Sequence, residues 1–136
     1  MKEIKFRVYY EAELNGEKMK GIEETCSWFL LTQTGQIMEY GPMRPPQKPN
    51  KNYTKLIPLF FTGLLDKNGV EIYENDLLKD PQGNIGRVFY NSKSASYLIN
   101  WKQKDGTYDT DNCLGYGEVI GNIYSNPDLL KESTND

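Results

Sequence analysis

The sequence lacks histidine altogether: none of its 136 residues is of this type. Histidine is the most frequent general base in enzymes and the most frequent metal ligand in proteins. Its absence excludes every Ser-His and Cys-His catalytic pair, so that catalysis would have to rely on carboxylates. The sequence therefore favours a non-enzymatic protein, for which we assign no catalytic residue, no metal ligand and no cofactor.

Cysteine is scarce, with only Cys26 and Cys113 in the chain. Two thiolates without histidine cannot complete a four-ligand zinc site. We interpret both as reduced, partly buried side chains, because free cysteine is among the residue types most often buried. A disulfide between them stays open, since sequence spacing does not fix the geometry that a disulfide needs.

Long apolar segments are missing as well. The longest nearly apolar run, Leu56–Phe61, is far too short to cross a bilayer. The first residues alternate between polar and apolar side chains and do not form the apolar core of a signal peptide. We therefore expect a cytoplasmic protein that does not contact membranes.

A surplus of positive charge is absent too. The 16 lysines and arginines are outnumbered by 19 aspartates and glutamates, which gives a formal net charge of −3. This balance argues against nucleic acid or an anionic membrane as the main partner. Aromatic residues make up 12% of the chain, which is typical of a folded protein and not of a disordered one.

Alternating apolar residues are the main pattern that is present. Apolar side chains recur at every second position from Ile4 to Tyr10, as in a strand with one buried face. Asn15-Gly16 is the strongest short signal for a hairpin turn. With further strands expected over residues 25–31 and 37–40, residues 1–40 are predicted to form a β meander.

Four prolines between residues 41 and 52 interrupt this pattern. Because proline lacks a backbone donor and fixes φ, neither a helix nor a central strand is expected here. We interpret residues 41–52 as an extended surface connector. A Pro-Pro ligand for an SH3 domain is the less favoured alternative, since such short motifs often occur without a partner.

Short strands separated by turns fill the rest of the chain. Turns are predicted at residues 66–69, 80–84 and 104–106, and strands at 53–62, 70–73, 76–79, 85–90, 97–101 and 118–124. Asn126 and Pro127 fit the start of a short helix. The prediction is a mainly β fold, with a small SH3-like barrel and a short C-terminal helix over residues 53–132 and a frayed tail at 133–136.

Three blocks of sequence resemble the YopX family, which consists of small proteins of bacteriophages and prophages. The blocks are residues 1–7, 61–78 and 119–130, and they follow one another in the family's order. Two departures are visible: Asn75 stands where the family usually has glycine, and Tyr9 or Tyr10 where it tends to have tryptophan. Asparagine tolerates the left-handed conformation, so the turn at Asn75 can form. The resemblance implies a mainly β fold, a phage or prophage origin and a location in the host cytoplasm, but no activity.

The residues of these blocks fit structural roles better than catalytic ones. We predict turn or close-approach glycines, turn-forming acidic and amide side chains, and caps of a turn or a helix. The residues in question are Gly63, Gly69, Gly121, Asp66, Asn68, Asp76, Asn126 and Pro127.

Two alternatives to a contact protein depend on particular residues. Asp105, Asp109 and Asp111 could bind Mg²⁺ or Ca²⁺ in a carboxylate enzyme, although a solvated turn explains the same cluster. A single-stranded nucleic acid could stack on aromatic residues that stand beside basic ones, although aromatic residues at strand spacing are more often core. This second set consists of Arg87, Val88, Phe89, Tyr90, Tyr97, Trp101 and Lys102.

The favoured hypothesis is a non-enzymatic interaction module that binds a host or phage protein. A meander of about forty residues buries too little apolar surface to be stable alone, so it has to dock on the rest of its own chain or on a second copy. Unprotected strand edges favour pairing between copies. We therefore predict a homo-oligomer in which the N-terminal strands contribute to the interface.

Overall fold

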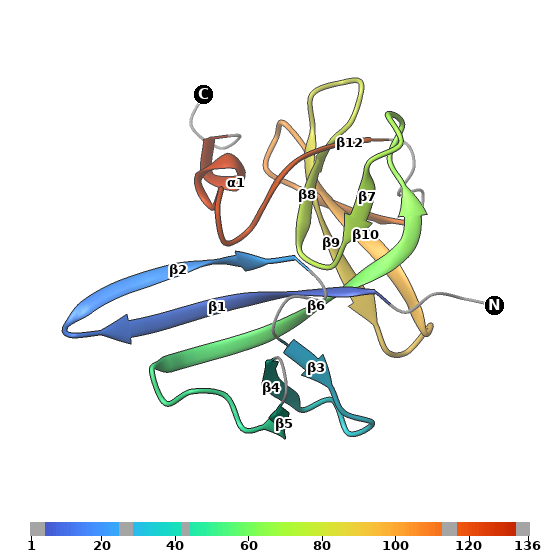
Figure 1. Cartoon of the computed structure of the whole chain (residues 1–136). Coiled ribbons are helices and arrows are strands. Elements are labelled where there is room, and N and C mark those ends of the chain that lie inside the picture. The colour runs from blue at the N-terminus through green and yellow to red at the C-terminus, as the bar shows by residue number, and fades with distance from the viewer. Residues whose placement is uncertain (1–4, 25–28, 42–43, 113–116, 133–136) are drawn as a thin grey trace. The chain divides into compact units, whose positions relative to one another are not determined.

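The computed structural model describes residues 5–24, 29–41, 44–112 and 117–132, and Cys26 and Cys113 lie outside them. These residues form a mainly β fold with a single short helix, which confirms the predicted fold class (Figure 1). The elements are β1 (Phe6–Leu14), β2 (Glu17–Glu23), β3 (Phe29–Leu31), β4 (Ile37–Gly41), β5 (Arg44–Gln47), β6 (Tyr53–Leu65), β7 (Glu71–Tyr73), β8 (Asp76–Lys79), β9 (Ile85–Asn91), β10 (Ser96–Lys102), β11 (Tyr108–Asp111), β12 (Glu118–Asn122) and α1 (Asp128–Glu132).

The chain divides into two compact units within the long strand β6. The N-terminal unit is Ile4–Phe60, and the C-terminal unit begins at Phe61. This boundary differs from the one we placed at residues 41–52. The first part of β6, up to Phe60, pairs with β1 and so belongs to the N-terminal unit. The proline-rich segment belongs to the same unit, because β5 pairs with β4.

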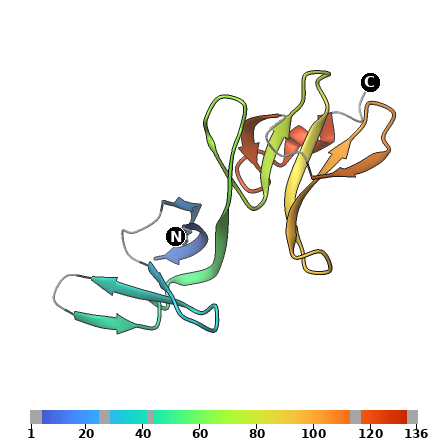
Figure 2. The ribbon, with the colours of Figure 1, turned by 90° about the vertical axis from the view of Figure 1, so that its right-hand side faces the viewer.

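The N-terminal unit contains two sheets and not one meander. β1 pairs with β2 on one side and with β6 on the other, so that Phe6 lies opposite Phe60. β3, β4 and β5 form a separate antiparallel sheet (Figure 2). Val8 of β1 packs with Phe29 and Ile37 from this second sheet in a common apolar core.

The proline-rich segment is more ordered than we expected. Arg44–Gln47 is the strand β5, which pairs with β4 at the end of the order β3-β4-β5. An edge strand bonds on one side only, so proline can be accommodated there without breaking a ladder of hydrogen bonds on both sides. The prediction that no central strand forms here agrees with this edge position, but the extended connector predicted for residues 41–52 did not include a strand at Arg44–Gln47.

The C-terminal unit contains a curved five-stranded antiparallel sheet that forms a half-barrel. Its strand order is β11-β10-β9-β8-β12. The inner face is apolar, and Gly86 makes room there for two large side chains, because an added Cβ would lie 2.8 Å from both Ile99 Cγ1 and Trp101 Cε3. The core residues are Ile72, Leu78, Val88, Ile99 and Trp101.

The helix α1 lies against β9 and is tied to the half-barrel by a lysine. Lys102 Nζ donates a hydrogen bond of 2.8 Å to the carbonyl oxygen of Leu130. The helix begins at Asp128, one residue later than predicted, and Asn126 Oδ1 accepts from the backbone N–H of Asn122 (3.3 Å). Among the described residues, no helix has the length and hydrophobicity to pass through a bilayer.

Candidate functional site

The turn between β1 and β2 has the backbone conformation that its sequence predicts. Asn15 and Gly16 have φ values of 54° and 81°. Two central residues with positive φ define the type I′ turn, whose twist matches that of the adjoining strands. The register that follows places Leu14 opposite Glu17 and Val8 opposite Glu23.

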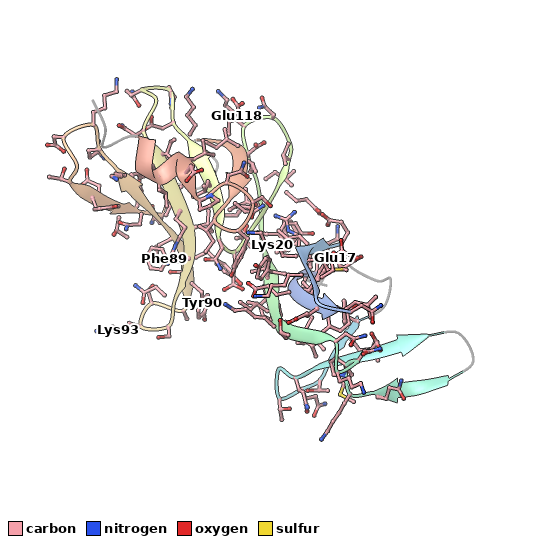
Figure 3. The ribbon with its side chains drawn as sticks, turned by 90° about the vertical axis from the view of Figure 1, so that its left-hand side faces the viewer. Glu17, Lys20, Phe89, Tyr90, Lys93 and Glu118 are labelled. Carbon is pink, nitrogen blue, oxygen red and sulfur yellow. The ribbon has the colours of Figure 1, made fainter. Side chains whose placement is uncertain are left out.

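The strand β2 has an open edge. In the sheet order β2-β1-β6-β7, the described residues place a neighbouring strand on only one side of β2. Its first four residues are all exposed, and Glu17 and Lys20 mark the strand in Figure 3. Met19 is 43% exposed, and Leu14 at the end of β1 is 48% exposed. The backbone groups on this edge are therefore accessible to a partner strand.

Opposite charges face each other across the same hairpin. Glu13 lies opposite Lys18, and Glu11 lies between Lys20 of β2 and Lys55 of β6. Opposite charges that face each other across strands stabilise a sheet, whereas like charges destabilise it. Because β2 also contains Glu17 and Glu23, it carries both signs of charge and not a single repulsive sign.

The other edge strands of the described sheets are shorter than the seven residues of β2. Of these, β12 has five residues, β5 and β11 have four, and β3 and β7 have three. Several carry features that discourage pairing: two prolines in β5, two aspartates in β11 and an irregular register in β12. The edge of β2 is therefore the best candidate contact site in the described part of the chain.

A second feature is a polar groove of about 550 Å³ in the half-barrel. Bonds between its own residues hold its walls: Asp80 Oδ1 accepts from the backbone N–H of Asn84 (2.8 Å), and Asp109 Oδ2 accepts from Gln103 Nε2 (3.2 Å). The turn at Asp80 agrees with its sequence, but no local pattern predicts that this turn faces β11. The groove is lined by Asp80, Gln82, Asn84, Trp101, Gln103, Asp109, Thr110 and Asp111.

The predicted acidic cluster is only partly brought together. Asp109 and Asp111 lie on β11 and line the groove, whereas Asp105 does not. Asp105 Oδ1 instead accepts from the hydroxyl (2.6 Å) and the backbone N–H (2.9 Å) of Thr107, and these bonds lower the pKa of Asp105. Within the described ranges, no group of three or more His, Cys, Asp or Glu side chains could hold a metal ion.

The predicted nucleic-acid residues are divided between the two faces of the half-barrel sheet. Tyr97 and Trp101 lie on the core face, and Lys102, which is only 7% exposed, points to the other face toward α1. Tyr90 and Tyr97 form an edge-on pair with ring centroids 5.1 Å apart. Burial, with smaller contributions from Glu74 and Tyr90, raises the pKa of Tyr97 to about 12. The structure thus does not gather this set into one stacking platform.

Two carboxylates of the central sequence block are buried and have structural partners. Asp66 Oδ1 accepts from the backbone N–H groups of Asn68 (2.8 Å) and Val70 (2.9 Å), and its Oδ2 accepts from that of Val119 (2.8 Å). Asp76 Oδ2 accepts from the backbone N–H of Tyr73 (2.8 Å). Both bond patterns agree with the predicted turn-forming and capping roles.

Asn75 and Gly121 also occupy the kinds of position that we predicted. Asn75 has a φ of 65°, so that it adopts the left-handed conformation that glycine would otherwise supply. A Cβ on Gly121 would overlap the side-chain oxygen of Asn126. Asn75 and Gly121 therefore have structural roles, because the local backbone conformation and packing depend on them.

Comparison with known proteins agrees with the sequence blocks. The sequence profile of the YopX protein family matches residues 5–131, which is nearly the whole chain. The crystal structure of protein EF1440 from Enterococcus faecalis is similar, with a TM-score of 0.52 and 24% identity, over 94% of this chain and 98% of that one. No curated protein matches the sequence. The chain belongs to the YopX family.

Proposed function

We propose that this protein is a non-enzymatic interaction module that assembles into a homo-oligomer through its N-terminal strands. The open edge of β2 carries the proposal, because every second residue of this seven-residue strand points its backbone donor and acceptor toward a partner strand. The absence of histidine supports a role in contact and not in catalysis. The phage or prophage origin, the host or phage partner and the cytoplasmic location, which the resemblance and the composition suggest, belong to the same proposal.

The mass of the protein in solution tests this proposal. Light scattering at tens of micromolar protein is expected to give a multiple of the chain's 15.7 kDa. A monomer mass under these conditions would overturn the proposal.

A proline in β2 tests whether its edge forms the interface. In a two-residue hairpin, Leu14 and Glu17 form a hydrogen-bonded pair, and such pairs alternate along the strands. The N–H of Lys20 therefore points to the open edge and not to β1. Lys20→Pro removes this donor, and we expect a folded monomer. Lys20→Ala removes the same side chain and is expected to keep the oligomer. An unchanged mass of the proline variant would contradict a β2 interface.

A further inference from the structure

The open edge of β2 also determines how two copies can pair. We propose that two chains associate antiparallel through β2 about a two-fold axis at Gly21, so that the β2-β1-β6 strands of the two copies form one continuous sheet. This inference rests on the proposed self-association and specifies its partner, a second copy, and its register.

The hairpin determines which backbone groups are available. Because Leu14–Glu17 is a hydrogen-bonded pair, the pairs formed by Met19 and Gly21 are of the same kind and point to β1. The N–H and C=O groups of Lys18, Lys20 and Ile22 therefore point outward. They are the groups that a second β2 would bond.

A two-fold axis limits the registers that can form. A two-fold axis perpendicular to the sheet relates two antiparallel strands and keeps each face of the sheet on the same side. The residue that lies at this axis is then opposite the same residue of the second copy. With Met19 on the axis, Lys18 would face Lys20 of the second copy. With Lys20 on the axis, Lys20 would face itself, and Glu17 would face Glu23. Both registers place like charges opposite each other, which is unfavourable.

The register with Gly21 on the axis avoids these conflicts. It pairs the seven residues from Lys18 to Glu24 of each copy. At each end of the interface, Lys18 of one copy faces Glu24 of the other. Between them, Met19 faces Glu23, and Lys20 faces Ile22. With Ile22 on the axis, Lys20 would also lie opposite a glutamate, Glu24. Only the five described residues from Lys20 to Glu24 could then pair. The longer register satisfies more backbone groups.

Gly21 is suited to the position on the axis. The residue on a two-fold axis faces its own copy, and glycine places no like charge opposite itself there. The ring of Tyr10 already covers this position from β1, since a Cβ on Gly21 would lie 3.1 Å from the Tyr10 hydroxyl oxygen. An aromatic ring over a strand glycine shields the backbone where it would otherwise be exposed.

Charge reversal tests the register. Lys18→Glu would place a carboxylate opposite the carboxylate of Glu24 at both ends of the proposed interface, and we expect the dissociation constant of the dimer to rise about tenfold. The double variant Lys18→Glu/Glu24→Lys restores both opposite-charge contacts and is expected to recover most of the affinity. Sedimentation equilibrium measures both dissociation constants. Glu24→Lys alone is a further control for the loss of the ion pair within one chain, in which Glu24 Oε1 lies 3.5 Å from Arg7 Nη1.

Lys20→Glu is the matched control for effects within one chain. Lys20 faces Glu11 in its own hairpin as Lys18 faces Glu13, so both reversals cost the hairpin a similar contact. In the Gly21 register Lys20 faces Ile22 of the second copy, and Glu24→Lys should not rescue Lys20→Glu.

The outcomes separate the register from the proposed function. Rescue of Lys18→Glu but not of Lys20→Glu supports the axis at Gly21. If Glu24→Lys rescues Lys20→Glu instead, the axis lies at Ile22 and the Gly21 register is wrong. An intact dimer in every variant also overturns the Gly21 register. In these two cases the self-association itself stands, whereas a monomeric wild-type protein overturns both.

Discussion

At the scale of single residues, the half-barrel core depends on a position without a side chain. Gly86 on β9 is buried, and it faces Trp101 across the register of β9 and β10. Its Cβ, if present, would approach Ile99 and Trp101 to 2.8 Å, closer than packed carbon atoms allow. Both neighbours belong to the core and have little room to move.

Enlarging Gly86 should therefore destabilise the protein. We expect Gly86→Val to lower the free energy of unfolding by about 1–3 kcal/mol or more, because overpacking forces core side chains out of their preferred rotamers. Urea denaturation measures this change. Arg87→Ala, at the exposed neighbouring position, is the control and should change stability by no more than about 0.5 kcal/mol. A Gly86→Val variant as stable as the control would contradict the packing that we describe.

Asp66 is the residue that joins the turn after β6 to the start of β12. It is 6% exposed and accepts three backbone hydrogen bonds, one of them from Val119 across 53 positions of sequence. Burial acts to raise the pKa of Asp66, but the N–H groups of Val119, Val70 and Asn68, with the nearby Lys67, outweigh it and leave this pKa below its usual value of 3.8.

A lowered pKa links this network to the pH dependence of stability. The ionised Asp66 contributes stability that is complete above the unfolded pKa of 3.8 and is lost as the pH falls through the lower pKa of the folded state. Asp66→Asn turns an amide N–H toward a backbone donor, and we expect a loss of about 1–3 kcal/mol near neutral pH. The gap to the wild type should narrow below pH 3.8, as denaturation curves across pH would show.

Asp105→Asn provides the comparison, because Asp105 also has a lowered pKa but accepts its bonds from Thr107 in its own exposed turn. Its loss should leave the stability close to that of the wild type, because the carboxylate is exposed. If both variants lost equal stability, the long-range bond of Asp66 to Val119 would not be the cause.

At the scale of elements, turns were the part of the fold that the sequence predicted best. Asn15-Gly16, the turn at residues 66–69 and the turn at residues 80–84 all form where local chemistry requires them. Glycine provides the positive φ in each: 81° at Gly16, 82° at Gly69 and 90° at Gly83. Such signals are local, so a short window of sequence contains them in full.

Elements and contacts that depend on distant partners were harder to predict. β11 consists of the exposed residues Tyr108–Asp111 and has no apolar face, so only its pairing with β10 makes it a strand. β5 is a strand in spite of two prolines because β4 lies beside it. The groove and the pairing of β1 with β6 likewise join segments far apart in sequence, and periodicity within one segment carries no information about such partners.

The hairpin turn gives a prediction about β2 as an element. Gly16 has open space around it, so Gly16→Ala adds no clash and only the strain of a positive φ, about 1 kcal/mol. Because β2 is held in place by β1 alone among the described strands, we expect both a lower melting temperature and a weaker dimer. Thermal denaturation and light scattering measure the two effects.

Gly69→Ala is the matched control for this variant. Gly69 has nearly the same φ and equally open space, but it lies in the turn between β6 and β7. It should lower the melting temperature by a similar amount and leave the mass in solution unchanged. Equal weakening of the dimer by both variants would show that general stability, and not the β1–β2 hairpin, controls association.

At the scale of the whole molecule, the charge of the chain does not prevent self-association. Two copies carry a formal net charge of −6, from −3 for each, so their long-range repulsion is modest and is screened by salt. The Lys18–Glu24 contacts proposed here would oppose that repulsion at the interface. Exposed ion pairs of this kind contribute about 0–1 kcal/mol each, so backbone bonds along the edge would have to supply most of the affinity.

Self-association should also make thermal stability depend on protein concentration. A partner that binds only the folded chain stabilises it by mass action, and a hundredfold rise in concentration above the dissociation constant contributes about 2.7 kcal/mol for each dimer. For a chain of 136 residues this raises the melting temperature by about 5 °C. Lys20→Pro, as a folded monomer, should melt at one temperature throughout the same range. Scanning calorimetry of both proteins at matched concentrations makes the comparison, and a wild-type melting temperature that does not move with concentration would show that β2 pairs no second copy in this range.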